Sequence, residues 1–106
     1  MADDDLEIRD NPDLRRYEAD LGGRLAGFSQ YRLEPARVTF THTKVDPEFE
    51  GRGIGSGLVR WQLDDARRRG LRIVPLCPFV KSYLRRHPEY ADIVDAPPGE
   101  GASAGS

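Results

Sequence analysis

Four alternating glycines between Pro47 and Leu58 constrain this chain more than any other feature. Glycine destabilises regular structure, yet here it stands between a β-branched stretch and a stretch with helical spacing. When a strand, a glycine loop and a helix follow one another directly, several backbone N–H groups point to one spot at the positive end of the helix dipole. The segment PEFEGRGIGSGL therefore predicts a cradle for a phosphate or pyrophosphate, and a flexible strand-to-helix turn is the simpler alternative. The glycines are Gly51, Gly53, Gly55 and Gly57.

Two common nucleotide-binding loops do not fit this segment. A nucleoside-triphosphate loop requires Gly-Lys-Ser or Gly-Lys-Thr at its end, and neither is present. The dinucleotide fingerprint Gly-x-Gly-x-x-Gly also fails. Its sixth position is Ser56 when counted from Gly51 and Leu58 when counted from Gly53.

The periodicity of the chain predicts an α+β, or mixed α/β, fold. The Gly-Gly pair at 22–23 is typical of a hairpin between two strands. The segment 37–45 is richest in β-branched residues, and its alternation places Val38, Phe40 and His42 on one face. In chain order, the sequence predicts strands at 15–21, 24–33 and 37–45, a helix at 57–70, a strand at 71–77, a helix at 78–90 and a last strand at 90–95.

Length and composition predict one domain at 1–95 and a disordered tail at 96–106. The 106 residues suit one modest core, with 38% apolar and 32% charged residues, and the tail is small and rich in Pro and Gly. The net charge of -2 gives no attraction to nucleic acid or to a membrane surface. The sequence predicts neither a secretory signal nor a transmembrane helix. A single cysteine permits no intrachain disulfide, which suits a cytoplasmic protein.

Two further clusters predict no site of their own. The run Arg67–Arg69 adjoins Asp64 and Asp65 and is interpreted as a solvated helix end, because a nucleic-acid patch requires more basic residues interleaved with aromatic ones. One cysteine and two histidines lack the spacing of metal ligands, so no metal site is expected.

The segment EGRGIG, Glu50 to Gly55, resembles the pyrophosphate loop of the GNAT (GCN5-related N-acetyltransferase) superfamily, Gln/Arg-x-x-Gly-x-Gly/Ala. Glu50 departs from the family's Gln or Arg, but the two small positions match. With HTKV, VPLCPF and RRHPEY, the chain is similar over about residues 17–94 to a very small, single-domain GNAT-like subfamily. In the family, backbone amides of this loop bind the pyrophosphate of acetyl-CoA. The resemblance implies the binding residues Val45, Arg52, Gly53, Ile54, Gly55 and Ser56.

The same resemblance implies a central, mostly antiparallel sheet with a V-shaped splay, flanked by helices and without N-terminal helices. In that fold the strand at 71–77 parts from the strand at 37–45, and the pantetheine arm lies in the gap. Proline cannot donate to a sheet ladder, so Pro75 and Pro78 suit such a splay. We therefore expect Pro75 to have no pairing partner on the side of 37–45.

Four side chains are candidates for chemistry. The resemblance places Cys77 at the mouth of the gap, where it is a candidate to accept the acetyl group, although a lone cysteine also suits a core. His42 and His87 are candidate bases. The simpler alternatives are that His42 is a half-buried polar residue and that His87 is a charge at the end of a helix. Tyr83 matches the family's general acid toward the CoA sulfur, or packs on the sheet.

These observations predict a GNAT-like N-acetyltransferase that passes an acetyl group from acetyl-CoA to an amine or other nucleophile, directly or through Cys77. A non-catalytic acyl-CoA binding or sensing module is the alternative, because little chain is left to build an acceptor pocket. A phosphate-loop interaction protein without a CoA role is a third reading. The sequence leaves the acyl acceptor and the oligomeric state open.

Overall fold

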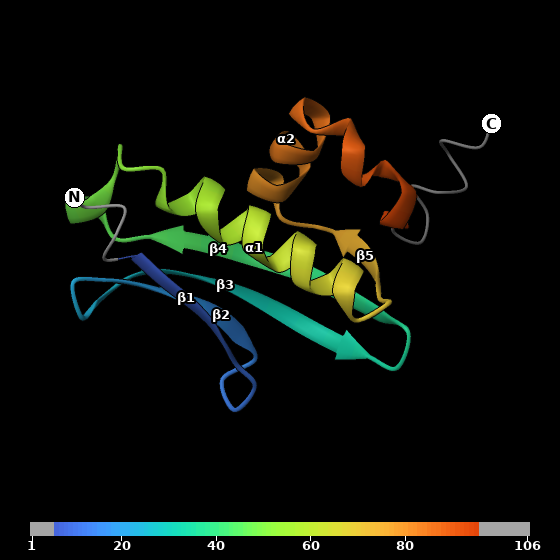
Figure 1. Ribbon diagram of the computed structural model, residues 1–106, viewed down its shortest axis with the longest axis horizontal. Helices are drawn as coiled ribbons and strands as arrows, with labels where there is room; N and C mark the ends of the chain where they lie inside the picture. The colour runs from blue at the N-terminus through green and yellow to red at the C-terminus, as the bar shows by residue number, and fades with distance from the viewer. Residues whose placement is uncertain (1–5, 96–106) are drawn as a thin grey trace.

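The computed structural model describes residues 6–95, which form one five-stranded sheet with two α-helices on the same face (Figure 1). The predicted disordered tail at 96–106 lies outside the described residues. The elements are β1 (Leu6–Asn11), β2 (Arg16–Leu21), β3 (Arg24–Glu34), β4 (Arg37–Val45), the 3-10 helix η2 (Pro47–Phe49), α1 (Ile54–Arg68), β5 (Arg72–Pro75), α2 (Pro78–Arg86) and the 3-10 helix η3 (Pro88–Ile93).

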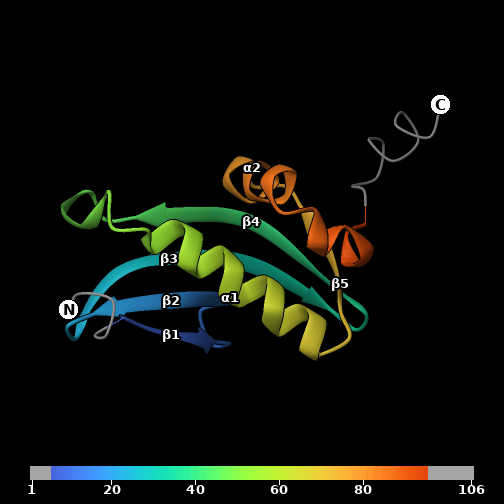
Figure 2. The same ribbon diagram turned by 45° about the horizontal axis from the view of Figure 1, so that its top comes forward.

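The sheet order β1-β2-β3-β4-β5 follows the chain. The first three pairs are antiparallel, whereas β4 and β5 are parallel. A parallel pair needs a crossover connection, and α1 supplies it by packing across β2, β3, β4 and β5. The second helix, α2, packs on β4, β5 and α1, so both helices cover one face (Figure 2). This architecture confirms the predicted mostly antiparallel α+β fold.

Two elements differ in kind from the prediction; in addition, α1 begins at Ile54 and not at residue 57, and α2 ends at Arg86 and not at residue 90. The edge strand β1 was not predicted, although Leu6 and Ile8 alternate with charged residues and pack against the core. The predicted last strand at 90–95 is wrong, because Pro88–Ile93 form a 3-10 helix and only Val94 bridges β5, at Ile73. Burial of the Tyr90 ring explains this turn of helix: it carries a side chain into the core that an edge strand would leave exposed.

A bulge in β4 overturns the predicted face of His42. Gln30 pairs with His42 but Tyr31 pairs with Phe40, so Thr41 is an extra residue in β4. One extra residue moves every side chain after it to the opposite face of the sheet. His42 therefore points to the open face of the sheet, beside Phe28, with ring centroids 6.4 Å apart. In its place, Thr43 turns toward the helices and contacts Cys77.

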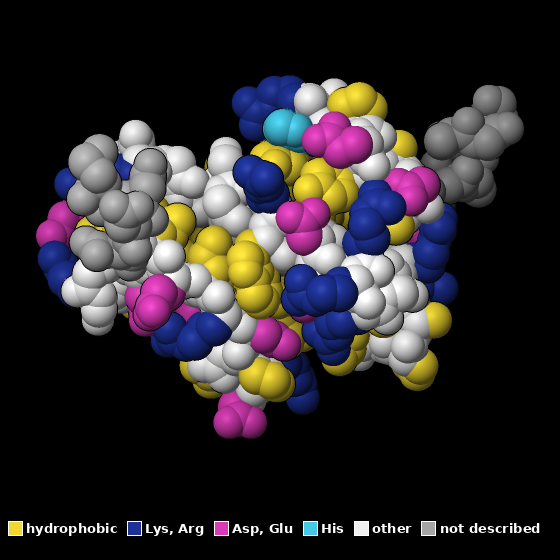
Figure 3. All heavy atoms as spheres, in the orientation of Figure 1, with side chains coloured by type: hydrophobic (Ala, Val, Ile, Leu, Met, Phe, Trp, Pro, Cys, Tyr) yellow, Lys and Arg dark blue, Asp and Glu magenta, His cyan; other side chains and the backbone are white. Residues whose placement is uncertain are grey.

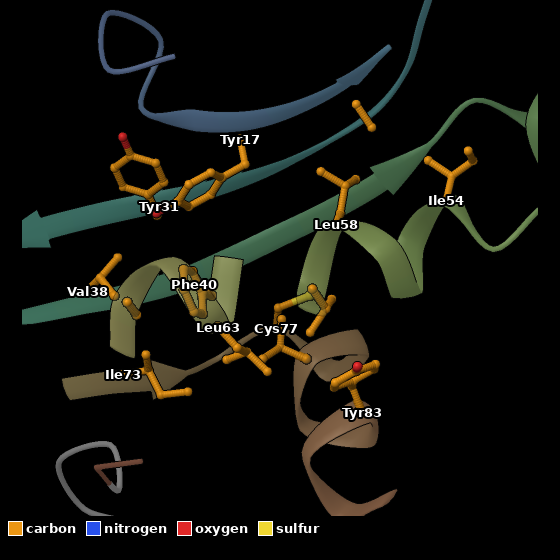
Figure 4. Close-up of a cluster of buried hydrophobic side chains, with 14 of the residues drawn as sticks. Tyr17, Tyr31, Val38, Phe40, Ile54, Leu58, Leu63, Ile73, Cys77 and Tyr83 are labelled. Atoms are coloured by element: carbon orange, nitrogen blue, oxygen red, sulfur yellow. The ribbon is translucent and has the colours of Figure 1, made fainter. Parts of the chain in front are cut away.

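The core lies between the sheet and the helices. Figure 4 shows side chains of β2, β3, β4, β5 and α1 in it, together with Cys77 and Tyr83 at α2. The C-terminal end of α1 follows the expected pattern, with Gly70 at a φ of +71° after the last turn. None of the helices within residues 6–95 is long and apolar enough to cross a membrane. Fully buried side chains of this core include Tyr17, Phe40, Leu58, Leu63 and Ile73.

The strands β4 and β5 pair over four residues and then part. Arg37–Phe40 pair with Arg72–Pro75. The amides of Leu76 and Cys77 then both donate to the Phe40 carbonyl oxygen, at 3.1 and 3.0 Å, and β5 ends. Among the described residues, the segment 41–45 of β4 has no strand partner on this side. This is the predicted splay.

The expectation that Pro75 has no partner is wrong, because Pro75 lies opposite Phe40. The direction of the amides explains why a proline is tolerated there. Arg72 donates to the Ala36 carbonyl and Leu76 to the Phe40 carbonyl, and donors toward one neighbour alternate along a strand. The missing N–H of Pro75 therefore faces away from β4, and the two strands part after Pro75.

Candidate functional site

The structure gives different reasons for glycine at the alternating positions of the loop. Gly51 and Gly53 adopt φ values of +84° and +74°, in the left-handed region that strains other residues. Gly55 lies inside α1, where an added Cβ would come within 2.6 Å of the Phe79 ring. Gly57 has a negative φ and only ordinary contacts around an added Cβ. Two glycines therefore shape the loop, and a third makes room for an aromatic ring.

The start of α1 offers free amides. Gly53 is its N-cap residue and provides no side-chain cap. The amides of Ile54, Gly55 and Ser56 have no acceptor among residues 6–95, as expected for a first helical turn. Gly53 and Ser56 are exposed, whereas Ile54 and Gly55 are buried. The positive end of the α1 dipole thus carries unpaired donors of the kind that bind an anion.

Cys77 lies where the two strands part. It is the N-cap residue of α2 and is only 3% exposed, within the core cluster. Its Sγ donates to Thr43 Oγ1 at 3.4 Å, and Thr43 Oγ1 lies 3.2 Å from Ser29 Oγ. Sequence reasoning missed Thr43 and Ser29, because only the bulge at Thr41 turns Thr43 to this face.

The structure does not bring either histidine to Cys77. His87 caps the C-terminal end of α2, and ten residues at about 1.5 Å each place it about 15 Å from Cys77 along the helix. His42 lies on the other face of the sheet. Among the described residues, Thr43 is the side chain that pairs with the thiol. No group of Cys, His, Asp and Glu within residues 6–95 is arranged to hold a metal ion.

Tyr83 and His87 form a stacked pair on α2. Their ring centroids are 4.0 Å apart with an interplanar angle of 19°. The His87 Nδ1 lies 3.4 Å from a carboxylate oxygen of Glu89. Burial raises the pKa of Tyr83 above its ordinary value, and the positive charge of Arg60 opposes this rise. The Tyr83 hydroxyl therefore stays protonated at neutral pH, as a general acid requires.

The contact between Gly55 and Phe79 yields a testable coupling. In a Phe79→Ala background, Gly55→Ala is expected to raise the free energy of unfolding by about 1 kcal/mol, because alanine is the better helix former. In the wild type most of this gain should disappear, because the new Cβ displaces the Phe79 ring. Urea denaturation of the four proteins measures the coupling. Equal effects of Gly55→Ala in both backgrounds would contradict the contact.

Comparisons with known proteins place this geometry in a family. A protein family described as GCN5-related N-acetyl-transferase matches this chain over residues 16–93. An aspartate/glutamate leucyltransferase of Stutzerimonas stutzeri (strain A1501) is 35% identical over 75 residues, which are 71% of this chain and 32% of the relative. The chain thus spans about a third of the length of the curated relatives it matches.

Solved structures agree with this match. The solution structure of a GCN5-like protein from Staphylococcus aureus has a TM-score of 0.67 and 25% identity, covering 90% of this chain and 93% of that one. A predicted acetyltransferase with acetyl-CoA from Clostridium acetobutylicum has a TM-score of 0.50 and 13% identity, covering 68% and 55%, and shows a likeness of fold. With a family match over most of its length, this chain belongs to the GCN5-related N-acetyltransferase family.

Proposed function

We propose that this protein binds acetyl-CoA across the start of α1 and the gap between β4 and β5, and transfers the acetyl group to an amine or a similar nucleophile. One observation carries the proposal. The unpartnered amides of Ile54, Gly55 and Ser56 begin α1, the segment 41–45 of β4 has no strand partner on the side of β5, and Cys77 lies where β5 parts from β4. Free amides, an unpaired strand edge and a thiol thus lie on neighbouring elements.

The donor fits this arrangement part by part. The three free amides would hold its pyrophosphate, beside the exposed Arg52 of the loop. Its pantetheine arm carries two amide groups, which can pair with the free backbone of 41–45, including Val45, as an added strand would. Leu76 and Phe79, 42% and 39% exposed, offer apolar surface on either side of Cys77.

In direct transfer, the acceptor amine attacks the thioester carbonyl carbon, a new C–N bond forms and the C–S bond breaks. The amine proton passes to a base, and the departing CoA sulfur takes a proton from an acid. Tyr83 stays protonated and is our candidate acid only for a sulfur that reaches the ring stacked on His87. His42 is our candidate base only for an acceptor that enters from the open face of the sheet, because its ring lies there beside Phe28.

In the covalent route, the Cys77 sulfur attacks the thioester carbonyl and CoA leaves as a thiol after taking the Cys77 proton. The acetyl group then sits on Cys77 and passes to the amine in a second step. Thioester exchange makes and breaks bonds of one kind, so it depends on position more than on bond energy. Thr43, which accepts the S–H hydrogen bond at 3.4 Å, orients the sulfur for this attack.

The experiment that tests the proposal combines calorimetric titration of acetyl-CoA with an assay of free CoA release in the presence of a panel of primary amines. Binding and amine-dependent release are the expected results. Binding without release would favour the acyl-CoA binding or sensing module instead. No binding would overturn the proposal. The leucyltransferase name of the curated relatives supports acyl transfer in general, and a leucyl donor is therefore the informative comparison.

A further inference from the structure

A pocket of about 400 Å³ lies on the open face of the sheet, beside the turn between β1 and β2. Gln30 and Arg32 point to this face, because Tyr31 between them packs into the core on the other side. Thr41, the extra residue of β4, lies next to them, and its hydroxyl donates to the Gln30 carbonyl oxygen at 3.3 Å. The pocket is lined by Leu14, Arg15, Gln30, Tyr31, Arg32 and Thr41.

This pocket adjoins the point where β4 and β5 part. Phe40 is the last residue of β4 that pairs with β5, and its carbonyl oxygen accepts the amide of Cys77 at 3.0 Å. Thr41, the next residue, lines the pocket. His42 lies opposite Gln30, on the same open face. The thiol and the pocket therefore flank one short stretch of β4 from its two faces, with the candidate base on the side of the pocket.

The two arginines of the pocket carry charge that no described side chain neutralises. Neither Arg15 nor Arg32 forms an ion pair or a side-chain hydrogen bond within residues 6–95. Arg16, on the same face, differs from them because it donates to Glu18 at 2.7 Å. Over the helices, basic and acidic side chains stand beside one another (Figure 3). Two unpaired guanidinium groups at one pocket attract an anion, and a carboxylate matches their planar geometry.

We infer that this pocket selects the acyl acceptor, and that the acceptor is an amine with a carboxylate a few bonds from its nitrogen. The inference rests on the proposed function and names the substrate class of that reaction. The carboxylate pairs with Arg15 and Arg32, while the amine lies at His42. Gln30, opposite His42, is two residues from Arg32, or about 6.6 Å along the strand. One small acidic molecule spans this distance together with the long arginine side chains.

The position of the pocket also determines the path of the reaction. The segment of β4 after Phe40 has no strand partner on the side of β5 within residues 6–95, so a thioester held in that gap can be reached from the open face. The amine nitrogen attacks the thioester carbonyl carbon, a C–N bond forms and the C–S bond breaks. His42 takes the amine proton, and CoA leaves as a thiolate.

Two observations favour an acidic acceptor over a phosphate of the donor as the occupant. The free amides at the start of α1, where we propose that the pyrophosphate binds, belong to a helix on the other face of the sheet. Leu14, at 55% exposure, adds an apolar surface beside the two arginines. Such a surface suits the methylene groups of an acidic side chain.

The test compares glutamyl-alanine amide with glutaminyl-alanine amide as acceptors, in an assay of CoA release from acetyl-CoA. The two amides have nearly the same shape and differ in charge. The wild type is expected to have a kcat/KM at least about tenfold higher for the glutamyl compound. Arg15→Gln and Arg32→Gln should each reduce this ratio to about threefold or less. Arg85→Gln is the matched control, because it removes the same charge from α2, at a different pocket.

A second pair of acceptors identifies the source of the carboxylate. Alanine and alaninamide differ only at the α-carboxylate. A preference for alanine that both Arg15→Gln and Arg32→Gln abolish would support the inference with a free amino acid as the acceptor. A preference for the glutamyl dipeptide alone would support it with the acidic side chain as the group that binds.

The outcomes separate this inference from the proposed function. If the wild type transfers acetyl groups equally well to the charged and the neutral acceptor of each pair, the assignment of the pocket is wrong and the proposed function stands. A preference that survives both arginine substitutions, or that Arg85→Gln also abolishes, would overturn the assignment too. Weaker binding of acetyl-CoA to both arginine variants in calorimetric titration would assign the pocket to the donor. Transfer to no amine at all would remove the proposed function and this inference together.

Discussion

Gly53→Val is expected to abolish acetyl-CoA binding, and Gly53→Ala to weaken it at least about tenfold. Gly53 holds a φ of +74° as the N-cap residue of α1, where a side chain is strained and a β-branched one most of all. A residue that leaves this conformation reorients the amides of Ile54 and Gly55. Calorimetric titration measures the loss of affinity.

The control separates strain from recognition. Gly70, at the other end of α1, has a similar φ of +71° and also has nothing within 4 Å of an added Cβ. Gly70→Ala should therefore lower the free energy of unfolding by about 1 kcal/mol, as Gly53→Ala does, without weakening acetyl-CoA binding. Wild-type affinity in Gly53→Ala would show that the amides at the start of α1 are not the anion site.

Cys77→Ala is expected to remove covalent acetylation while keeping the donor bound. After incubation with acetyl-CoA, intact-mass spectrometry should show one added acetyl group on the wild type and none on Cys77→Ala. Affinity for CoA should change less than about threefold, because the pyrophosphate contacts lie on the glycine loop. Thr43→Val, which removes the partner of the thiol, should slow acetylation while leaving its site unchanged.

Two results would decide against the covalent route. Full turnover of Cys77→Ala with an identified amine would leave direct transfer as the mechanism. A wild-type thiol that is neither acetylated by acetyl-CoA nor alkylated by iodoacetamide in the folded protein would return Cys77 to a purely structural role. Cys77 is only 3% exposed and belongs to the core cluster, which suits a structural residue. The non-catalytic acyl-CoA binding module would then be the favoured function.

The sequence by itself determined the features that depend on neighbouring residues. The hairpin at Gly22–Gly23 joins β2 to β3, with both glycines at positive φ. The helix predicted from Pro78 begins there, because proline suits the first turn of a helix. A glycine loop between a strand and a helix was also readable, although α1 begins at Ile54 and not at the predicted residue 57. Each of these signals lies within a few residues of the structure that it specifies.

Only the tertiary structure decided which distant side chains meet. The bulge at Thr41 arises from the pairing of β4 with β3, and it places Thr43 on the face where His42 was expected. Likewise Gly55 accommodates Phe79, and Arg60 faces Arg86, through the packing of α1 against α2. Register and packing angle depend on contacts between residues far apart in the chain, and a one-residue shift moves a side chain to the opposite face. Local periodicity records no such shift, so the glycine loop was predictable and the partners of its site were not.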